Sequence, residues 1–183
     1  DGMGMYGNVL FPGANDNGSG TAMVIDLARH YATGKKSKYS VMVMLCAGEE
    51  AGLIGSNYYV NHPLFPMKKI RMVVNLDMVA SGQTGCTLFN GTTWPMETDM
   101  ILKMNEEIGA LPGIRPVGPA ANSDHHPFHA KGVPAIFFIT SGKVGPGHTA
   151  FDFAKDSWYP QYDKMFTLIT NFVEKLSGTP EPV

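Results

Sequence analysis

Two adjacent glutamates, Glu49 and Glu50, directly follow the apolar run 41–46. The run reads Val-Met-Val-Met-Leu-Cys, which is typical of a strand buried in a parallel sheet, so the pair is expected where that strand ends. Two carboxylates held side by side repel each other unless a cation or a shared proton neutralises them. One interpretation is a solvated surface turn. The other is a metal site in which one carboxylate binds the ion and its neighbour handles the proton of a metal-bound water.

Three further groups able to bind a metal lie at the ends of other predicted elements. Asp16 precedes the first predicted helix, Asp77 closes a second apolar strand, and His148 follows the last strand. Open α/β sheets place their sites at the carboxyl ends of strands, so these groups are expected at one edge. Oxygen and imidazole donors without thiolates suit Zn²⁺ or a similar divalent ion. Singly, Asp16 equally fits an acid that complements a helix dipole, and Asp77 a turn former. Together with Glu50 they indicate one convergent site.

The elements that must position these residues alternate between strand and helix. Helices are predicted over 19–31, 52–61, 97–109 and 161–176, and strands over 41–46, 70–77, 86–94 and 134–140. This alternation predicts an α/β layered fold with a largely parallel sheet. The loop 111–127 is rich in proline and glycine, and a loop of that length in a compact domain is expected to serve function.

Length and composition describe one ordinary globular domain. The 183 residues fit a single domain over 1–183, with 44% hydrophobic and 16% charged residues. Fourteen basic against sixteen acidic residues give a net charge of −2, which recruits neither nucleic acid nor an anionic membrane. No apolar run approaches the roughly 18 residues of a membrane span. Cys46 and Cys86 are too few for a disulfide framework or a thiolate zinc site.

Five short motifs carry a resemblance to a known family. They are Gly-Ala-Asn-Asp-Asn-Gly-Ser-Gly at 13–20, Gly-Glu-Glu-Ala-Gly-Leu-Ile-Gly-Ser at 48–56, Asn-Leu-Asp-Met at 75–78, Ser-Asp-His-His-Pro-Phe at 123–128 and Gly-His-Thr at 147–149. In this order the chain resembles the M28 family of co-catalytic zinc peptidases. The resemblance implies a three-layer α/β/α catalytic domain with a central, mostly parallel mixed sheet. It also implies that the opening strands of that sheet precede this chain, so that the domain is N-terminally incomplete.

The resemblance also implies a role for each candidate residue. Asp16 would bridge two zinc ions, Glu50 and His148 would complete the shell of one, and Asp77 would bind the other. Glu49 would be the general base, which takes a proton from the zinc-bridging water and passes it to the leaving amine. The roles agree with the chemistry, because two zinc ions activate a shared water and stabilise the oxyanion that forms.

The chain departs from the family pattern at its start. The second zinc of the family also takes a histidine from a His-x-Asp motif. Asp1 resembles the aspartate of that motif, which orients the histidine without binding the metal itself. The histidine would lie two residues before this chain begins. The 183 residues would therefore fully ligate one Zn²⁺, whereas the complete protein would bind two. Asp124 would act near the site by positioning other groups or substrate, and its alternative is an Asx turn. The neighbouring His125, His126 and His129 are not expected to be ligands.

The predicted function is a metal-dependent exopeptidase acting on peptides with a free N-terminus. One alternative is a glutaminyl cyclase that uses a single zinc ion. Another is a catalytically inactive, M28-like binding protein, since a fold alone does not establish activity. The metal stoichiometry of the complete protein separates the first two. The resemblance also favours a secreted or periplasmic protein.

Overall fold

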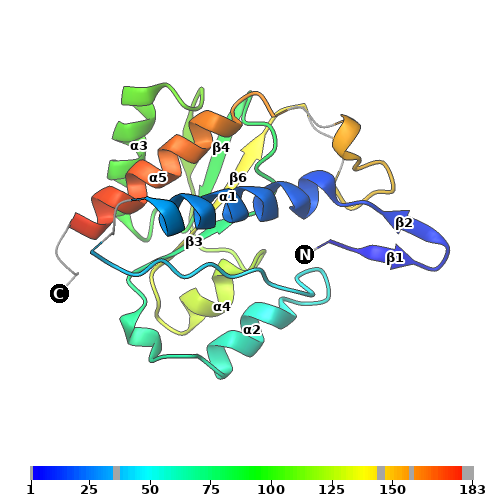
Figure 1. Ribbon diagram of the computed structural model, residues 1–183, viewed down its shortest axis with the longest axis horizontal. Helices are drawn as coiled ribbons and strands as arrows, with labels where there is room; N and C mark the ends of the chain where they lie inside the picture. The colour runs from blue at the N-terminus through cyan, green and yellow to red at the C-terminus, as the bar shows by residue number, and fades with distance from the viewer. Residues whose placement is uncertain (1, 35–37, 144–146, 157–158, 179–183) are drawn as a thin grey trace.

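The computed structural model describes residues 2–34, 38–143, 147–156 and 159–178 of the chain (Figure 1). Its helices are α1 (Gly20–Thr33), α2 (Ile54–Asn61), α3 (Pro95–Ile108), α4 (His125–Ala130) and α5 (Tyr162–Gly178). Its strands are β1 (Gly4–Tyr6), β2 (Val9–Phe11), β3 (Val73–Leu76), β4 (Gly85–Phe89), β5 (Ile114–Pro116) and β6 (Ala135–Ser141). Short helical turns cover η1 (Ala14–Ser19), η2 (Met67–Lys69) and η3 (Ala154–Asp156).

The central sheet has four strands in the order β3-β6-β4-β5. β3 pairs with β6 in parallel and β4 with β5 in parallel, whereas β4 and β6 run antiparallel. The sheet is therefore mixed and mostly parallel, as the sequence predicts. β6 lies inside the sheet because its first four residues are all apolar and buried, as expected for a strand that is covered on both faces.

Helices cover both faces of this sheet and make three layers (Figure 1). One face carries α1, α3 and α5, which share an apolar core with the sheet through residues such as Met23, Ile101 and Leu168. The other face carries α2 and α4, which pack through a smaller cluster that includes Tyr59 and Phe128. The predicted α/β/α architecture is confirmed. No helix in the described ranges is both long and apolar enough to cross a membrane.

Helix α5 shows why the sequence prediction works for this core. The apolar residues of its stripe recur at helical spacing, and all of them are buried: Met165, Leu168, Ile169, Phe172 and Leu176. Helices α1, α2 and α3 also lie close to their predicted ranges. In the predicted loop 111–127, in contrast, a short strand β5 forms and α4 begins, so the loop is less irregular than its proline content indicates.

The run 41–46 forms no strand, so the prediction of a buried strand there is wrong for the described residues. The segment is irregular, and Val41, Met42, Val43 and Leu45 remain exposed. A strand needs ladder hydrogen bonds to a neighbour as well as apolar side chains. Among the described residues, no strand pairs with this run. Cys46 at its end is only partly buried, Cys86 is buried, and neither takes part in a disulfide within the described residues.

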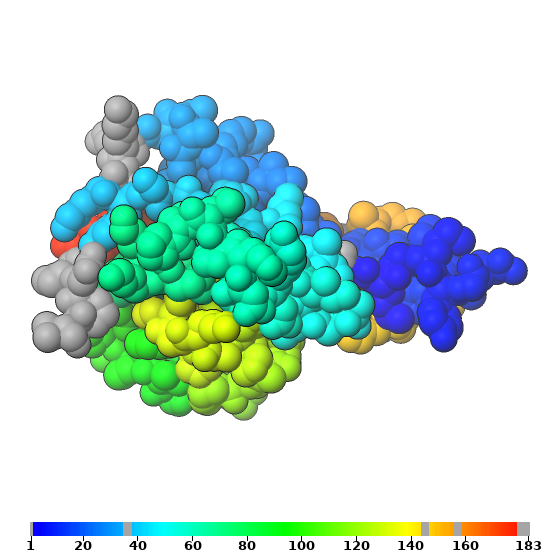
Figure 2. Space-filling view, turned by 90° about the horizontal axis from the view of Figure 1, so that it is seen from below, coloured from blue at the N-terminus to red at the C-terminus, as the bar shows by residue number. Residues whose placement is uncertain are grey.

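The sequence analysis did not predict the β1–β2 hairpin. The two strands pair antiparallel from Gly4–Phe11 to Tyr6–Val9, outside the central sheet. Figure 2 shows this hairpin projecting from the body of the molecule beside the segment 147–156. Its side chains are mostly exposed, so the apolar alternation that marks a half-buried strand is lacking.

Candidate metal centre

The loop that carries Asp16 is fixed against the end of β3 by polar side chains. The Asn17 side chain donates to the Leu76 carbonyl (2.9 Å), and its oxygen accepts from the backbone N–H groups of Gly20 and Met78. Helix α1 starts directly on the strand at this point. A Cβ at Gly20 would lie 2.1 Å from the Leu76 carbonyl oxygen, so this position requires glycine.

A buried carboxylate holds the backbone of the same loop from the opposite side. The side chain of Asp152 accepts hydrogen bonds from the N–H groups of Asn15 (2.9 and 3.0 Å) and Asp16 (2.9 Å). The backbone N–H of Ala14 also donates to the Asp152 carbonyl. The peptide bond between Asp16 and Asn17 is cis. Because Asp152 lies four residues after His148, these contacts join the two loops that bring Asp16 and His148 together.

Three of the predicted ligands converge at the edge where β3 ends. The His148 Nε2 atom lies 2.9 Å from Oδ2 of Asp16 and 2.9 Å from Oε1 of Glu50. The candidate ligand atoms of the three residues all lie within 4.8 Å of one another. Asp16 is 6% exposed, Glu50 20% and His148 63%, so the cluster is buried on the carboxylate side and open on the histidine side. We call this edge, with Asp16, Glu50 and Asp77, the metal edge.

The buried oxygens of the cluster fit a divalent cation. Oδ2 of Asp16, Oε1 of Glu50 and Oδ1 of Asp77 are buried and accept no hydrogen bond, and the first two face the His148 Nε2 atom at 2.9 Å. A buried carboxylate oxygen without a partner is costly, and a bound cation removes that cost. Ligand atoms around a tetrahedral Zn²⁺ at roughly 2.0–2.1 Å lie about 3.3 Å apart, close to the separations in this cluster. The residues present therefore suit the ion that the sequence predicts.

The carboxylates crowd one another at the metal edge. Burial, followed by the charges of Asp77 and Glu50, raises the pKa of Glu49 to about 7. Burial also raises the pKa of Asp77 to about 6, against the effect of its hydrogen bond from Ser123. Burial and the neighbouring Glu50 raise the pKa of Asp16 as well. All three shifts have the same physical cause, since negative charge is concentrated where solvent is scarce.

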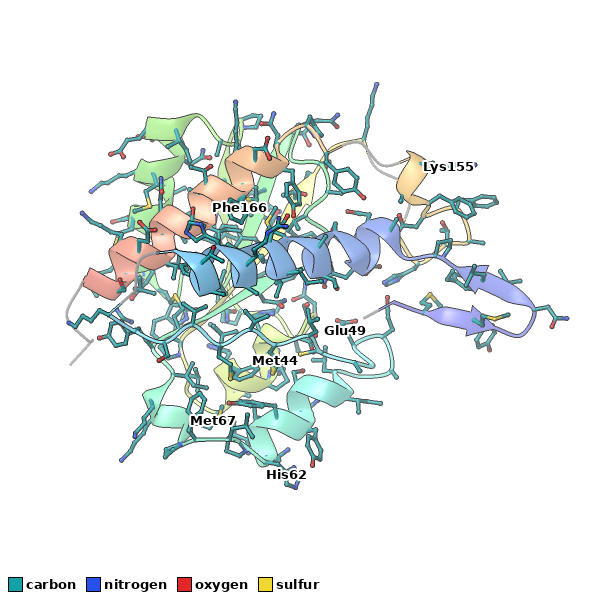
Figure 3. All side chains as sticks on the ribbon, viewed as in Figure 1. Met44, Glu49, His62, Met67, Lys155 and Phe166 are labelled. Atoms are coloured by element: carbon teal, nitrogen blue, oxygen red, sulfur yellow. The ribbon has the colours of Figure 1, made fainter. Side chains whose placement is uncertain are left out.

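Glu49 lies in the turn between the run 41–46 and α2 (Figure 3). The turn is closed by hydrogen bonds from the N–H groups of Gly52 and Leu53 to the Glu49 carbonyl. Leu53 adopts a left-handed conformation with φ of 57° as the chain enters α2. The short turn keeps Glu49 and Glu50 at the same edge, and the side chains of both lie partly buried there.

The remaining predicted residues are placed around this cluster. Asp77 closes β3, and its Oδ2 accepts a hydrogen bond from Ser123, which in turn accepts one from Asn75 (2.8 Å each). Asp124 accepts a hydrogen bond from Ser56 of α2. The charge of Asp124 contributes to the raised pKa of Glu49. Asp1 lies outside the described residues.

Two residues of the site were missed in the sequence analysis. Asp152 and Ser123 each hold a metal-edge residue in place through hydrogen bonds that span 136 and 46 positions of the chain. The sequence signals are that Asp152 lies shortly after the motif at 147–149 and that Ser123 is the first residue of the motif at 123–128. His125, which follows Asp124, is fully buried against Phe137 and is not part of the cluster.

An α/β sheet with converging carboxylates and a histidine at its carboxyl edge defines a class of proteins that bind divalent cations there. Comparison with known protein families identifies the family within this class. The chain belongs to peptidase family M28, whose family model matches residues 1–173. Aminopeptidase YwaD of Bacillus subtilis is 30% identical over 138 residues, which are 73% of this chain and 30% of that protein. Leupeptin-inactivating enzyme 1 of Streptomyces exfoliatus is 33% identical over 124 residues, 67% of this chain and 28% of that protein.

Solved structures agree with this assignment. A zinc aminopeptidase from Bacillus subtilis superposes with a TM-score of 0.76 and 28% identity, over 90% of this chain and 42% of that chain. A glutaminyl cyclase from an Acidobacteriales bacterium matches with a TM-score of 0.70 and 20% identity, over 93% and 64% of the two chains, and shares the fold. The chain spans about 30% of the length of the curated relatives it matches.

Proposed function

We propose that the full-length protein is a zinc-dependent aminopeptidase that removes N-terminal residues from peptides. The observation that carries this proposal is the convergence of Asp16, Glu50 and His148, whose buried carboxylate oxygens accept no hydrogen bond. The aminopeptidase activity named for the Bacillus subtilis relative and for the matched zinc aminopeptidase structure supports it. Zinc, when bound, would polarise the scissile carbonyl and make a water molecule more acidic.

The residues of the chain would divide the work as follows. Asp16, Glu50 and His148 would hold one ion, and Asp16 with Asp77 would contribute to a second. Glu49 adjoins the candidate ligand Glu50 in sequence and lies partly buried at the same edge, so it would accept the proton of the attacking water. It would then deliver that proton to the leaving amine. Burial, and then the charges of Asp77 and Glu50, raise the pKa of Glu49 to about 7, and bound cations would lower it.

The same edge would also select substrates with a free N-terminus. A protonated amine is attracted to the carboxylates that lie there, whereas a blocked N-terminus loses that attraction. His148 is 63% exposed, so the cluster is accessible from solvent on that side.

The proposal is tested by Glu49→Gln in the full-length protein. We expect kcat for an aminoacyl amide to fall by at least about 10²-fold, because the proton acceptor is lost, while the zinc content per chain stays unchanged. The matched control is Glu106→Gln on the exposed face of α3, which should leave both quantities as they are. Normal turnover by the Glu49 variant would contradict the assignment of the base.

A second experiment separates the proposal from a glutaminyl cyclase with one zinc ion. The described residues supply three ligands for one ion, which is the observation that favours the cyclase. Two zinc ions per full-length chain, with release of N-terminal residues, would support the peptidase. One ion together with cyclisation of N-terminal glutamine would support the cyclase, and zinc without either activity would support a binding protein. Secretion or a periplasmic location is part of the proposal and is tested by fractionating cells that express the full-length gene.

A further inference from the structure

The hairpin of β1 and β2 exposes apolar side chains on both of its faces. Met5 is 68% exposed, and the register pairs it with the exposed Leu10 on one face. Tyr6, which is 77% exposed, pairs with the exposed Val9 on the other face. Residues 2–15 include no charged side chain. A two-stranded hairpin is at best marginally stable in water by itself, so an uncharged hairpin with two apolar faces marks a binding surface.

Both ends of the hairpin are attached to the metal edge. At its start, a Cβ at Gly2 would lie 3.7 Å from the Asp16 carbonyl oxygen. At its end, β2 leads within two residues into η1, which carries Asp16. The Ala14 N–H donates to the Asp152 carbonyl at this point, which joins the stem of the hairpin to the segment that carries His148. The hairpin therefore projects from the metal edge beside that segment (Figure 2).

A peptide bound at the cluster extends toward the hairpin. The cluster is buried on its carboxylate side and open at His148, which is 63% exposed. When the first residue of a substrate lies at the cluster, the rest of the peptide leaves through this open side. Phe151 is 70% exposed and lies three residues after His148 on the same segment. The residues that follow the cleaved bond therefore pass His148 and Phe151 and reach the hairpin.

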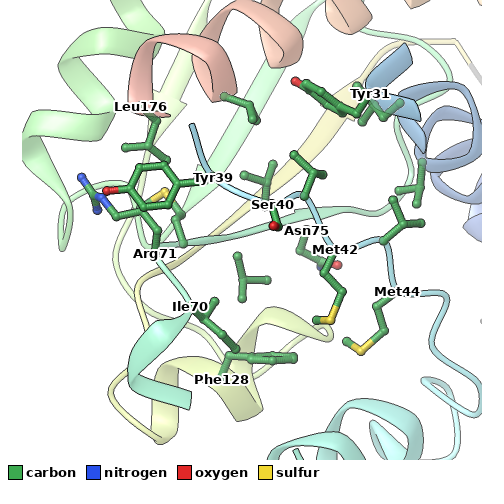
Figure 4. Close-up of a pocket in the computed structure, with 18 of the residues that line it drawn as sticks. Tyr31, Tyr39, Ser40, Met42, Met44, Ile70, Arg71, Asn75, Phe128 and Leu176 are labelled. Atoms are coloured by element: carbon green, nitrogen blue, oxygen red, sulfur yellow. The ribbon is translucent and has the colours of Figure 1, made fainter. Parts of the chain in front are cut away.

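The cavity between the run 41–46 and β3 is a less suitable path for the peptide (Figure 4). Its walls carry apolar side chains such as Met42, Ile70 and Phe128, and none of the three candidate ligands lines it. A peptide in this cavity would hold its amine away from the ligands. The path along the hairpin keeps the amine at the metal edge, where the carboxylates attract it.

The outer edge of β1 offers main-chain groups to such a peptide. Within the described residues, β1 pairs only with β2, and these two strands form a sheet of their own. Tyr6 and Val9 flank a two-residue turn, so Met5 directs its N–H and C=O away from β2. The stem of β2 is bonded to the segment of His148, so β1 has the open edge (Figure 1). An edge of this kind takes up an extended peptide as an additional strand.

We propose that the outer edge of β1 binds the substrate beyond the cleaved bond as an added strand, and that the enzyme thereby prefers peptides with uncharged, apolar residues at these positions. This inference rests on the proposed aminopeptidase function. β1 runs outward from the metal edge, and the peptide runs outward from its amine at the cluster, so the two strands are parallel. β1 has three residues, which at roughly 3.3 Å per residue match about three residues of the peptide. Met5 and Tyr6 meet side chains on opposite faces of the added strand.

The dependence of turnover on peptide length tests this inference in the full-length protein. The substrates are amides that share one accepted first residue, followed by the first one to five residues of Val-Ala-Val-Ala-Val, and the release of the first residue is measured. We expect kcat/KM to rise about tenfold between one and three downstream residues and then to stay level, because further residues no longer meet β1. Aspartate in place of the valines should remove most of the rise.

The same series separates this inference from the proposed function. Equal kcat/KM for one, two and three downstream residues would overturn the role of β1 and leave the aminopeptidase intact. A protein that hydrolyses no member of the series would overturn the proposed function, and this inference with it.

Met5→Glu connects the effect to the hairpin. It adds a negative charge at the edge of β1, so the rise between one and three downstream residues should fall below about threefold. Peptides with lysine at the second or third downstream position should be cleaved better by this variant than by the parent, a gain that damage to the hairpin would not produce. The matched control is Met96→Glu in the first turn of α3, 63% exposed, which should keep the length dependence of the parent. An unchanged rise in Met5→Glu would overturn the inference.

Sedimentation velocity over a hundredfold range of concentration tests a competing occupant, a second copy of the chain paired with β1. We expect the sedimentation coefficients of the parent and of Met5→Glu to agree at every concentration. An assembly that forms with concentration and is abolished by Met5→Glu, together with kcat/KM values independent of peptide length, would assign the edge to a second copy and overturn the inference.

Discussion

The two sides of β3 differ in how completely their polar groups are satisfied. On the side we call closed, β6 and β4 complete a ladder, and Phe138 lies fully buried among apolar neighbours. On the open side, the outer edge of β3 pairs with no strand of the described residues, and the metal edge holds buried carboxylate oxygens that accept no hydrogen bond. Both sides are equally apolar in sequence, as the runs 41–46 and 135–139 show. The difference teaches that apolar pattern determines which segments are extended, while the presence of neighbours determines which become strands.

The largest effect is expected on the closed side. Phe138→Ala should lower the free energy of unfolding of the full-length protein by about 3–5 kcal/mol, because it leaves a cavity in a packed layer. Chemical denaturation monitored by circular dichroism measures it. The control Phe151→Ala removes a ring that is 70% exposed and should change the same quantity by less than about 1 kcal/mol. An equal loss of unfolding free energy in the two variants would contradict the distinction between a packed and an open region.

Lowering the pH should also destabilise the closed side, through protonation of the buried His125. Burial, and then the neighbouring His126 and His129, lower the pKa of His125 to about 4, from 6.5 in the unfolded chain. The unfolded chain therefore binds this proton more readily. Stability is complete above about pH 6.5 and falls as the pH drops toward 4, by up to about 3 kcal/mol. Unfolding followed across this range should show a smaller loss for His125→Phe, whereas His62→Gln, at an exposed position, should behave like the parent.

On the open side, the buried anchor Asp152 should affect both stability and metal binding. Asp152→Asn weakens the charge-assisted hydrogen bonds to the Asn15 and Asp16 N–H groups, so a cost of about 2 kcal/mol in unfolding free energy is expected. Zinc affinity of the full-length protein should fall roughly 10–100-fold in competition with a chelator. Asp99→Asn on the exposed face of α3 is the control. A zinc affinity equal to that of the parent would show that the loop holds Asp16 without this support.

The smallest effect on activity is expected for Asp124, which accepts a hydrogen bond from Ser56. Asp124→Asn removes one of the negative charges felt by Glu49, and we expect kcat to fall about tenfold while zinc content stays constant. The pH dependence of kcat should shift toward lower pH, because the charge that raises the pKa of Glu49 is weaker. A loss of zinc with no shift of the profile would make Asp124 a purely structural residue.

The sequence predicts the closed side better than the open side for physical reasons. The stripe of α5 and the apolar run of β6 are local patterns whose burial follows directly from periodicity. The groups at the metal edge are predictable because their chemistry is distinctive and they stand in motifs at strand ends. The role of Asp152 is not predictable from local pattern, because its partners are backbone N–H groups 136 and 137 positions away. The prediction for 41–46 was wrong because it assumed a neighbour that the described residues do not provide.

The side chain of Asn17 has a consequence for the length of the sheet. Its amide occupies the Leu76 carbonyl, the last outward acceptor of β3. A chain that paired with the outer edge of β3 could therefore form ladder hydrogen bonds only as far as Val74, because the next outward carbonyl, that of Leu76, is already taken. One neutral amide thus sets the point at which the open edge of β3 ends and the metal edge begins.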